Sequence, residues 1–371
     1  MYDNLYTKWR PNTFNDIIGQ KNIVKYFKNA IFFKKIHHSY IFTGYNGIGK
    51  TTIARLLVKS INCININELL IKSNNFPCNT CENCILINEN KFYDYIEIDA
   101  AIKNSIDDIK LLLENIIYYP IKSKYKIYLI DEIHILSKQG FSALLKSLEE
   151  PPNYIKFILA TNDIKKIPEN ILSRCIVLNF EKISICDIVK RLVFILDNEN
   201  IKYTKKSLYN ISIFSNGSIR NSLNILEQCI LISNNNTINI DIVNKILNIC
   251  DINLLLDIIN SIVINNICLF NKCINYINKY TFNYNNIFIN IINILHILFM
   301  LKIDKNYIIN PILYSENDIK KILYISNNAS IKNLNLFIKY LFKYNKYINY
   351  YFNEKIGFNL FFIRIFYIIN N

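Results

Sequence analysis

The hydrophobic positions of the chain change their spacing near residue 180. Before that point, five short apolar runs read as buried strands, and amphipathic helical segments separate them. Strands that alternate with crossover helices predict an α/β domain with a parallel sheet and helices on both faces. The expected strands cover residues 40–43, 95–99, 127–131, 156–160 and 175–179.

After residue 180 the pattern becomes helical. Ser184, Thr204 and Ser218 precede apolar segments of helical period and are suitable N-caps. Beyond about residue 250 the chain stays helical and is rich in Ile, Asn, Tyr and Phe. We therefore expect three domains, covering residues 1–180, 181–250 and 251–371.

Residues 44–51 read Gly-Tyr-Asn-Gly-Ile-Gly-Lys-Thr and match the phosphate-binding pattern G-x-x-x-x-G-K-[ST]. A strand precedes the loop and a helix follows it, so backbone N–H groups and the positive end of the helix can surround a phosphate. The pattern predicts that Lys50 contacts the β- and γ-phosphates and that the Thr51 hydroxyl binds Mg²⁺. An alternative is a loop that binds nucleotide without hydrolysing it. The predicted nucleotide-binding residues here are Gly44, Tyr45, Asn46, Gly47, Ile48, Gly49, Lys50, Thr51 and Thr52.

Two further strands end in polar residues. The strand 127–131 ends in Asp131 and is followed by Glu132. The carboxyl ends of parallel strands meet beside the phosphate loop, so we expect Asp131 to hold Mg²⁺ and Glu132 to activate the attacking water. The strand 156–160 is followed by Thr161 and Asn162, and either side chain could contact the γ-phosphate or the water.

Two arginines are candidates for sensing the nucleotide. Arg174 lies just before the last strand of the first domain, and Arg220 begins a helix of the second. Arg174 is either a surface residue or a finger that stabilises the transferring phosphoryl group in a neighbouring subunit. Arg220 is either a surface residue or a group that folds back onto the nucleotide.

Four of the ten cysteines form the spacing C-x14-C-x2-C-x2-C. Four thiols at this spacing can close a tetrahedral site of the kind that holds structural Zn²⁺. We therefore predict a zinc module within residues 63–84. Its ligands are Cys63, Cys78, Cys81 and Cys84.

Other acidic and histidine side chains lack suitable partners in the sequence. Glu97 and Asp99 share one face of a strand, but nothing nearby supplies the rest of a polymerase or nuclease metal site. The four histidines lack partners at ligand spacing, and we expect them to be structural.

Composition adds a weak preference for a polyanionic partner. The formal net charge is +14, which suits nucleic acid, but an AT-rich coding sequence would also raise the lysine content. The amino terminus lacks the apolar segment of a signal peptide, and the best apolar runs (287–301 and 358–369) are interrupted by polar residues. We expect a cytoplasmic protein without a membrane segment.

Together these motifs resemble the gamma/tau subunit family of the bacterial DNA polymerase III clamp loader, which are AAA+ ATPases. The resemblance is strong to about residue 230 and beyond that depends on length and helical character. It is carried by Lys8-Trp9-Arg10-Pro11, Phe14-Asn15-Asp16-Ile17-Ile18-Gly19-Gln20, residues 36–40, the phosphate loop, the four cysteines, residues 97–101, Asp131-Glu132-Ile133-His134, residues 144–152, Ser173-Arg174-Cys175 and residues 217–220.

The resemblance implies a P-loop ATPase domain, a helical lid and a helical collar that holds subunits together. It implies that Thr161 is the first sensor, that Arg220 is the second and that Arg174 acts in trans. It implies that Lys103 faces the DNA backbone. It also assigns four residues to an adenine pocket: Arg10, Pro11, Ile17 and Ile18.

The implied function is an ATP-driven motor that opens the sliding clamp and loads it on primer–template DNA. The implied partners are further copies of the chain and the delta and delta-prime subunits, the implied cofactors are ATP, Mg²⁺ and Zn²⁺, and no polymerase active site is expected. The chain departs from the family pattern at two places. It has Asn221-Ser222 where the family has Asp-Ala. It also ends at the collar without the tau tail, which puts direct coupling to polymerase and helicase in doubt. The alternatives are a delta-prime-like scaffold that binds but does not hydrolyse nucleotide, and a helicase-type motor.

Overall fold

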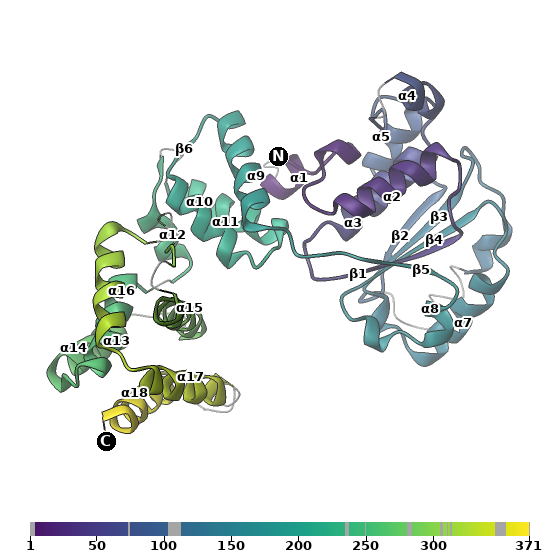
Figure 1. Ribbon diagram of the computed structural model, residues 1–371. Helices are drawn as coiled ribbons and strands as arrows, with labels where there is room; N and C mark the ends of the chain where they lie inside the picture. Colours follow the sequence, from purple (N-terminus) through teal and green to yellow (C-terminus); the bar gives the residue numbers. More distant parts are fainter. Residues whose placement is uncertain are drawn as a thin grey trace. The chain divides into compact units, whose positions relative to one another are not determined.

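The chain is described by a computed structural model with two compact units (Figure 1). The first comprises residues 1–199 and 212–227, and the second comprises residues 200–211 and 228–371. The structure describes residues 4–72, 75–102, 113–233, 237–248, 250–279, 284–304, 307–309, 311, 314–345 and 354–370.

The first unit contains a five-stranded sheet in the order β2-β3-β4-β1-β5, and its neighbouring strands pair in parallel. Each predicted strand is confirmed, with its ends within one residue of the expected position. The strands are β1 (Ser39–Thr43), β2 (Tyr95–Asp99), β3 (Lys126–Asp131), β4 (Ile155–Thr161) and β5 (Ile176–Asn179).

Helices cover both faces of this sheet, as predicted. Alternate strand residues point to opposite faces, so Ile158 and Ala160 of β4 join one hydrophobic core, whereas Phe157 and Leu159 join the other. Helices α2 and α3 supply the first core and helices α7 and α8 the second. Their bounds are α2 Lys21–Phe32, α3 Lys50–Ile61, α7 Lys138–Glu149 and α8 Glu169–Leu172.

Short segments complete the first unit around the sheet. Helix α9 (Ile185–Asn198) begins at Ser184, whose hydroxyl accepts a hydrogen bond from the Asp187 N–H, as its predicted role as an N-cap requires. The remaining short elements are α1 (Leu5–Lys8), η1 (Phe14–Asp16), α4 (Ile66–Lys72), α5 (Glu82–Asn88), η2 (Asn115–Ile117), η3 (Ile133–Ile135) and η4 (Ile164–Lys166).

The chain after residue 180 is mainly helical, as predicted, with one addition. Strands β6 (Lys202–Tyr203) and β7 (Thr237–Ile238) form a short parallel pair that the helical pattern did not indicate. The helices are α10 (Lys205–Phe214), α11 (Ile219–Ile232), α12 (Ile240–Ile246), α13 (Ile252–Val263), α14 (Ile267–Lys279), α15 (Tyr284–Ile303), α16 (Glu316–Asn328), α17 (Ile331–Asn345) and α18 (Glu354–Asn370).

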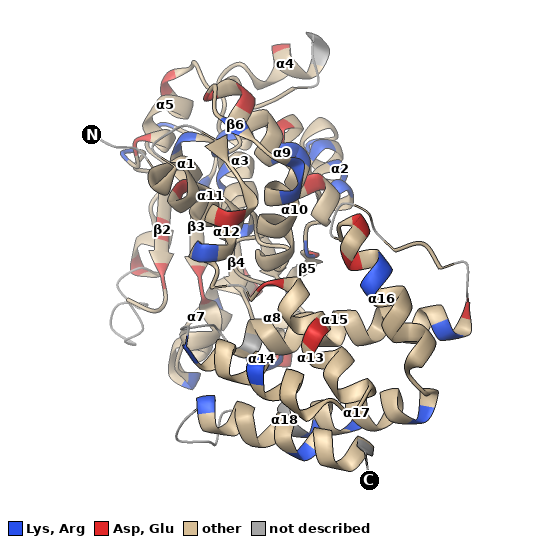
Figure 2. Cartoon of the chain, turned by 90° about the vertical axis from the view of Figure 1, so that its left-hand side faces the viewer, with Lys and Arg blue, Asp and Glu red and all other residues tan. Residues whose placement is uncertain are grey.

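Helices α13 to α18 share one hydrophobic core of mostly Ile, Leu and Phe side chains. Figure 2 shows α15, α17 and α18 with few charged residues. By length and composition alone, the segment Asn286–Ile303 of α15 is apolar enough to cross a membrane. One face of α15 is nevertheless buried in this core through Ile287, Ile291, Leu295 and Leu298, which is also the pattern of a core helix in a soluble protein.

Candidate active site and metal site

A cavity of about 520 Å³ lies in the first unit beside the loop between β1 and α3. This volume is in the usual range for small-molecule and cofactor sites. Four of the residues predicted for the nucleotide site do not line it (Gly44, Tyr45, Thr161 and Arg174), and Lys103 lies outside the described residues. The predicted residues that do line it are Arg10, Pro11, Ile17, Ile18, Asn46, Gly47, Ile48, Gly49, Lys50, Thr51, Thr52, Asp131, Glu132 and Arg220.

The loop touches the start of α11 at Gly47. This glycine has a φ of +74°, and a Cβ atom there would lie 2.2 Å from the Ser218 Oγ and 2.8 Å from the Arg220 Cβ. The Arg220 N–H donates a 3.3 Å hydrogen bond to the Gly47 carbonyl. Only glycine allows this close approach without strain.

The Lys50 ammonium is buried at the floor of the loop. It donates hydrogen bonds to the carbonyls of Gly44 and Tyr45, at 2.5 and 3.1 Å, and to the Asn162 Oδ1 at 2.5 Å. Burial lowers the pKa of Lys50, while the nearby Glu132 and Asp131 carboxylates raise it. These contacts hold a cation inside the loop.

The end of β3 brings two carboxylates to the same edge of the cavity. The Thr51 hydroxyl donates a 3.2 Å hydrogen bond to the Asp131 Oδ2, so one hydroxyl and one carboxylate of the kind that Mg²⁺ prefers lie together. Glu132 follows with a left-handed φ of 51°, which turns the chain sharply after the strand. Its N–H donates a 2.9 Å hydrogen bond to the Asp131 Oδ1.

At the end of β4 the structure places Asn162, rather than Thr161, against the Lys50 and Glu132 side chains. The Asn162 amide nitrogen donates to both Glu132 carboxylate oxygens, at 2.6 and 2.7 Å, and its oxygen accepts from Lys50. The fully buried Thr161 hydroxyl contacts the Asp163 carbonyl at 3.2 Å and the His134 Nδ1 at 3.3 Å. The residue that contacts Lys50 and Glu132 directly is therefore Asn162, whereas the resemblance implies that Thr161 is the first sensor.

His134 follows the turn after β3 and contacts the side chains at its end. Its Nδ1 lies 3.3 Å from the Glu132 Oε2, so the imidazole connects the Thr161 hydroxyl to the same carboxylate that Asn162 holds. Spacing along the sequence did not reveal this partner, because the turn at Glu132 brings the two side chains together.

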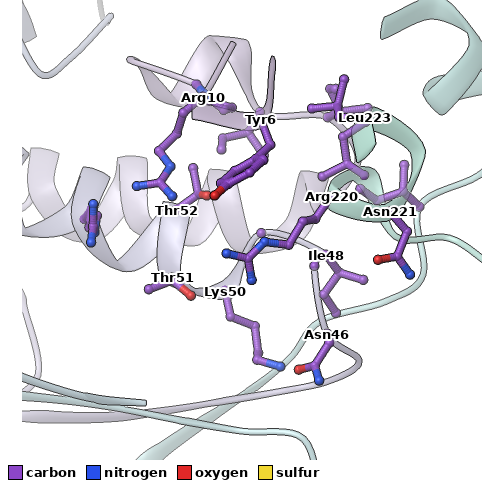
Figure 3. A pocket seen from close by; sticks show the side chains of 18 of the residues that line it. Tyr6, Arg10, Asn46, Ile48, Lys50, Thr51, Thr52, Arg220, Asn221 and Leu223 are labelled. Carbon is purple, nitrogen blue, oxygen red and sulfur yellow. The ribbon is translucent and has the colours of Figure 1, made fainter. Parts of the chain in front are cut away.

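Two arginines extend into the cavity from different segments (Figure 3). Arg10 comes from the amino-terminal segment and Arg220 from the start of α11, where its guanidinium lies 5.3 Å from the ring centre of Tyr6. Burial is the main cause that lowers the pKa of Arg10, and the neighbouring Arg55 and Arg220 charges act in the same direction. Such a concentration of cations suits an anionic ligand.

Sequence reasoning missed a second polar group in the cavity wall. Arg55 of α3 forms two hydrogen bonds of 2.9 Å with the two Glu97 oxygens, and the Tyr95 hydroxyl donates a 2.6 Å hydrogen bond to the same carboxylate. Burial raises the pKa of Tyr95 well above its ordinary value, so the hydroxyl stays protonated and donates. A bidentate pair of this type fixes the position of Arg55 beside Arg10.

The amino-terminal segment is also tied to α9. The Trp9 Nε1 donates a 2.8 Å hydrogen bond to Glu199, and Arg191 donates a 2.9 Å hydrogen bond to the Trp9 carbonyl. The Trp9 ring packs edge-on against Phe194. These contacts position Arg10, the next residue, at the cavity.

Arg174 lies away from this cavity, at the end of α8. Its guanidinium donates 2.7 Å hydrogen bonds to Glu149 and to the Asn170 carbonyl, and about a third of the side chain is exposed. It is therefore held at the surface of the unit, where a neighbouring molecule can approach it.

The four predicted zinc ligands form one cluster, with all four sulfur atoms within 4.8 Å of one another. Individual Sγ–Sγ distances are 3.4 Å for Cys63–Cys78, 3.9 Å for Cys78–Cys84 and 4.0 Å for Cys63–Cys81. A tetrahedral zinc site with Zn–S bonds of 2.3 Å needs sulfur atoms about 3.8 Å apart. The hydrogen bond with Cys84 lowers the pKa of Cys63 to about 5, whereas burial raises the pKa of Cys81 and the hydrogen bond with Cys63 raises that of Cys84. Thiols of the cluster therefore have to release protons when a metal binds.

Two family models match the chain. The model described as DNA polymerase III, delta subunit, covers residues 19–184, and the model described as DNA polymerase III clamp loader subunit, ATPase lid domain, covers residues 187–235. A parallel sheet with a phosphate loop, followed by this lid, defines an AAA+ ATPase of the clamp-loader class.

Comparison with individual proteins shows which family within this class the chain belongs to. The DNA polymerase III subunit gamma of Buchnera aphidicola subsp. Baizongia pistaciae is 42% identical over 89% of this chain and 88% of its own length. The subunit of the same name from Buchnera aphidicola subsp. Schizaphis graminum is 41% identical over 96% of both chains. This chain therefore belongs to the family of DNA polymerase III gamma subunits, the ATPase subunits of the clamp loader.

Among solved structures, the RuvB Holliday junction branch migration motor of Thermotoga maritima shares 19% identity. The match covers 68% of this chain and 79% of that chain, with a TM-score of 0.47.

Proposed function

We propose that this chain is an ATP-driven motor subunit of the clamp loader, which opens the sliding clamp and loads it on primed DNA by hydrolysing ATP to ADP and phosphate. Family membership supports this proposal, and the contacts around Glu132 favour hydrolysis over a scaffold role. The observation that most directly supports this proposal is the continuous chain of hydrogen bonds that joins Lys50, Asn162 and Glu132 at the cavity.

In this proposal, the residues around the phosphate loop divide the chemistry. Lys50 neutralises the β- and γ-phosphates, and the Thr51 hydroxyl and Asp131 hold Mg²⁺, which neutralises further phosphate charge when bound. Glu132 orients and activates the attacking water, with Asn162 holding both carboxylate oxygens. Loop residues from Gly44 to Thr52 bind phosphate through backbone N–H groups.

The two arginines outside the loop report on the bound nucleotide. Arg220 contacts the phosphates from the lid side of the cavity, and Arg174 completes the site of a neighbouring subunit. An arginine added in trans stabilises the charge that develops on the transferring phosphoryl group. The exposure of Arg174 and its surface pair with Glu149 support this role.

The remaining assignments follow from family membership and are also proposals. The base lies among Arg10, Pro11, Ile17 and Ile18, and the four cysteines hold structural zinc. Residues 1–180, 181–250 and 251–371 act as ATPase domain, lid and collar. The partners are further copies of this chain, delta and delta-prime subunits, the sliding clamp and primer–template DNA, which Lys103 contacts. The chain acts in the cytoplasm and leaves polymerization to another subunit.

The test is the steady-state ATPase rate of the reconstituted clamp loader, measured with and without sliding clamp plus primed DNA. We expect stimulation by clamp and DNA in the wild type and its loss in Arg174→Ala. Lys166→Ala is the matched control, since it removes an exposed cation from the same region of the first unit without touching the proposed finger.

The outcomes separate the two candidate functions. Loss of stimulation in Arg174→Ala alone supports a motor with a trans arginine. Absence of stimulation in the wild type, with ATP bound stoichiometrically, would instead establish the scaffold function. Equal loss in both variants would show that surface charge, and not the proposed finger, controls the rate.

A further inference from the structure

Lys59 is a buried cation that the proposed mechanism does not use. It lies on α3, nine residues after Lys50, and only 4% of its surface is exposed. Its ammonium donates two hydrogen bonds of 3.0 Å, one to the Asn79 Oδ1 and one to the Asn88 Oδ1. Both acceptors are neutral amides.

Neutral amides do not compensate a buried positive charge. Among the residues that the structure describes, no carboxylate forms an ion pair with Lys59. The cationic side chains of Arg55 and Arg10 contribute repulsion. An uncompensated ammonium in an interior is strongly unfavourable, so an anion close to Lys59 is needed to explain its burial.

The cysteine cluster can supply this anion, because it carries negative charge when its thiolates bind a metal. Asn79 directly follows Cys78, and Asn88 lies one helical turn beyond Cys84 on α5, so both hydrogen bonds place the ammonium beside cluster ligands. Burial lowers the pKa of Lys59, and the neighbouring Cys84 sulfur is the group that raises it. Four thiolates around one Zn²⁺ leave two surplus negative charges.

We infer that Lys59 is the outer-shell cation of the cysteine cluster, offsetting one surplus charge of the zinc tetrathiolate and thereby strengthening metal binding. This inference rests on the proposed zinc site. It adds to the metal module a residue that lies 19 to 25 positions before three of the four ligands in the sequence. Outer-shell partners of this kind change metal affinity by about 10- to 100-fold when removed.

A purely structural role for Lys59 predicts a different effect of its removal on stability. If Lys59 only joined Asn79 to Asn88, its removal would destabilise the protein equally with and without metal. If it offsets cluster charge, its removal weakens the zinc-bound form but relieves the metal-free form of an uncompensated cation. The sign of the stability change therefore depends on zinc.

The experiment uses the full chain as wild type, Lys59→Met and Lys91→Met. Methionine keeps the unbranched stem of lysine without its charge. Lys91 is an exposed lysine beyond the cysteines that pairs with Glu89, so Lys91→Met is the matched control. Zinc affinity is measured by competition with a chromophoric chelator. We expect Lys59→Met to bind zinc about 10- to 100-fold more weakly and the control to equal the wild type.

Thermal unfolding supplies the second measurement. With zinc, Lys59→Met should melt below the wild type, and after verified zinc removal it should melt above it. Lower melting in both states, with unchanged zinc affinity, would overturn the inference. A wild type that takes up no zinc would refute the zinc site itself, which the stoichiometry of bound metal reports separately.

Asn88→Asp tests the same charge argument if Lys59→Met does not fold. Its carboxylate keeps an acceptor for Lys59 but returns a negative charge beside the cluster. We expect weaker zinc binding although Lys59 is intact, because the cation then serves two anions. Unchanged or tighter binding in Asn88→Asp would count against the inference.

Discussion

The contact between the phosphate loop and the start of α11 makes Gly47 the sharpest point at which to perturb the site. Gly47→Ala adds one methyl group to a residue with a φ of +74°. That methyl group would lie 2.2 Å from the Ser218 Oγ and 2.8 Å from the Arg220 Cβ, so either the loop or the turn before α11 must move. Displacing the turn withdraws Arg220 from the cavity that it lines.

Two costs determine the size of the effect. Left-handed backbone costs a residue with a Cβ atom about 1–2 kcal/mol, and overpacking adds about 1–3 kcal/mol. In Gly47→Ala, the contact between the phosphate loop and the turn before α11 is therefore disfavoured by about 2–5 kcal/mol. At about 1.4 kcal/mol per tenfold change, nucleotide affinity should fall between about 30-fold and more than 10³-fold.

The assay is calorimetric titration with a non-hydrolysable ATP analogue in the presence of Mg²⁺. Gly140→Ala is the control, because a Cβ there has its nearest neighbour at 3.5 Å and alanine favours the helix by up to about 1 kcal/mol. Ser218→Ala combined with Gly47→Ala removes the shortest contact and should restore part of the affinity. Unchanged affinity in Gly47→Ala would refute the reasoning. No recovery in the double variant would leave backbone strain and the contact with the Arg220 Cβ as the cause.

Two further predictions concern the polar groups at the floor of the cavity. Lys50→Ala should abolish ATP binding, because it removes the ammonium that the loop carbonyls and Asn162 hold at the proposed phosphate position. Retention of full affinity in titration would contradict this assignment. Asn162→Ala should lower kcat far more than Thr161→Val, because Asn162, unlike Thr161, contacts both Lys50 and Glu132. The opposite order in steady-state ATPase rates would return the first-sensor role to Thr161.

The fold could be predicted well because its signals are local. Strands buried on both faces read as continuous apolar runs, and β1, β3 and β4 are such runs in this chain. The phosphate loop could be predicted because glycine, lysine and threonine each have a specific task at fixed spacing. By contrast, β6 and β7 are two residues long, and their pairing depends on segments more than thirty residues apart.

The polar partners of the site escaped prediction for a different reason, since side chains distant in the sequence meet there. The pair between Arg55 and Glu97 joins α3 to β2, and nothing in the spacing of either segment indicates it. Lys59 is similar, because a lysine on a helix is ordinarily exposed and only the fold of the cysteine module buries it.

The choice between Thr161 and Asn162 could have been made from the sequence by one additional step. Side chains alternate along a strand, and in β4 the even-numbered Ile158 and Ala160 face the core that contains α3. Lys50 begins α3, so the next even-numbered residue, Asn162, points toward it, whereas the odd-numbered Thr161 points toward the side of α7 and His134. Knowing which face of the sheet holds the phosphate-loop helix is therefore enough to assign the polar residues at the end of a neighbouring strand. The same alternation explains why Asp131, two residues after Leu129 of the α3-side core, meets the Thr51 hydroxyl.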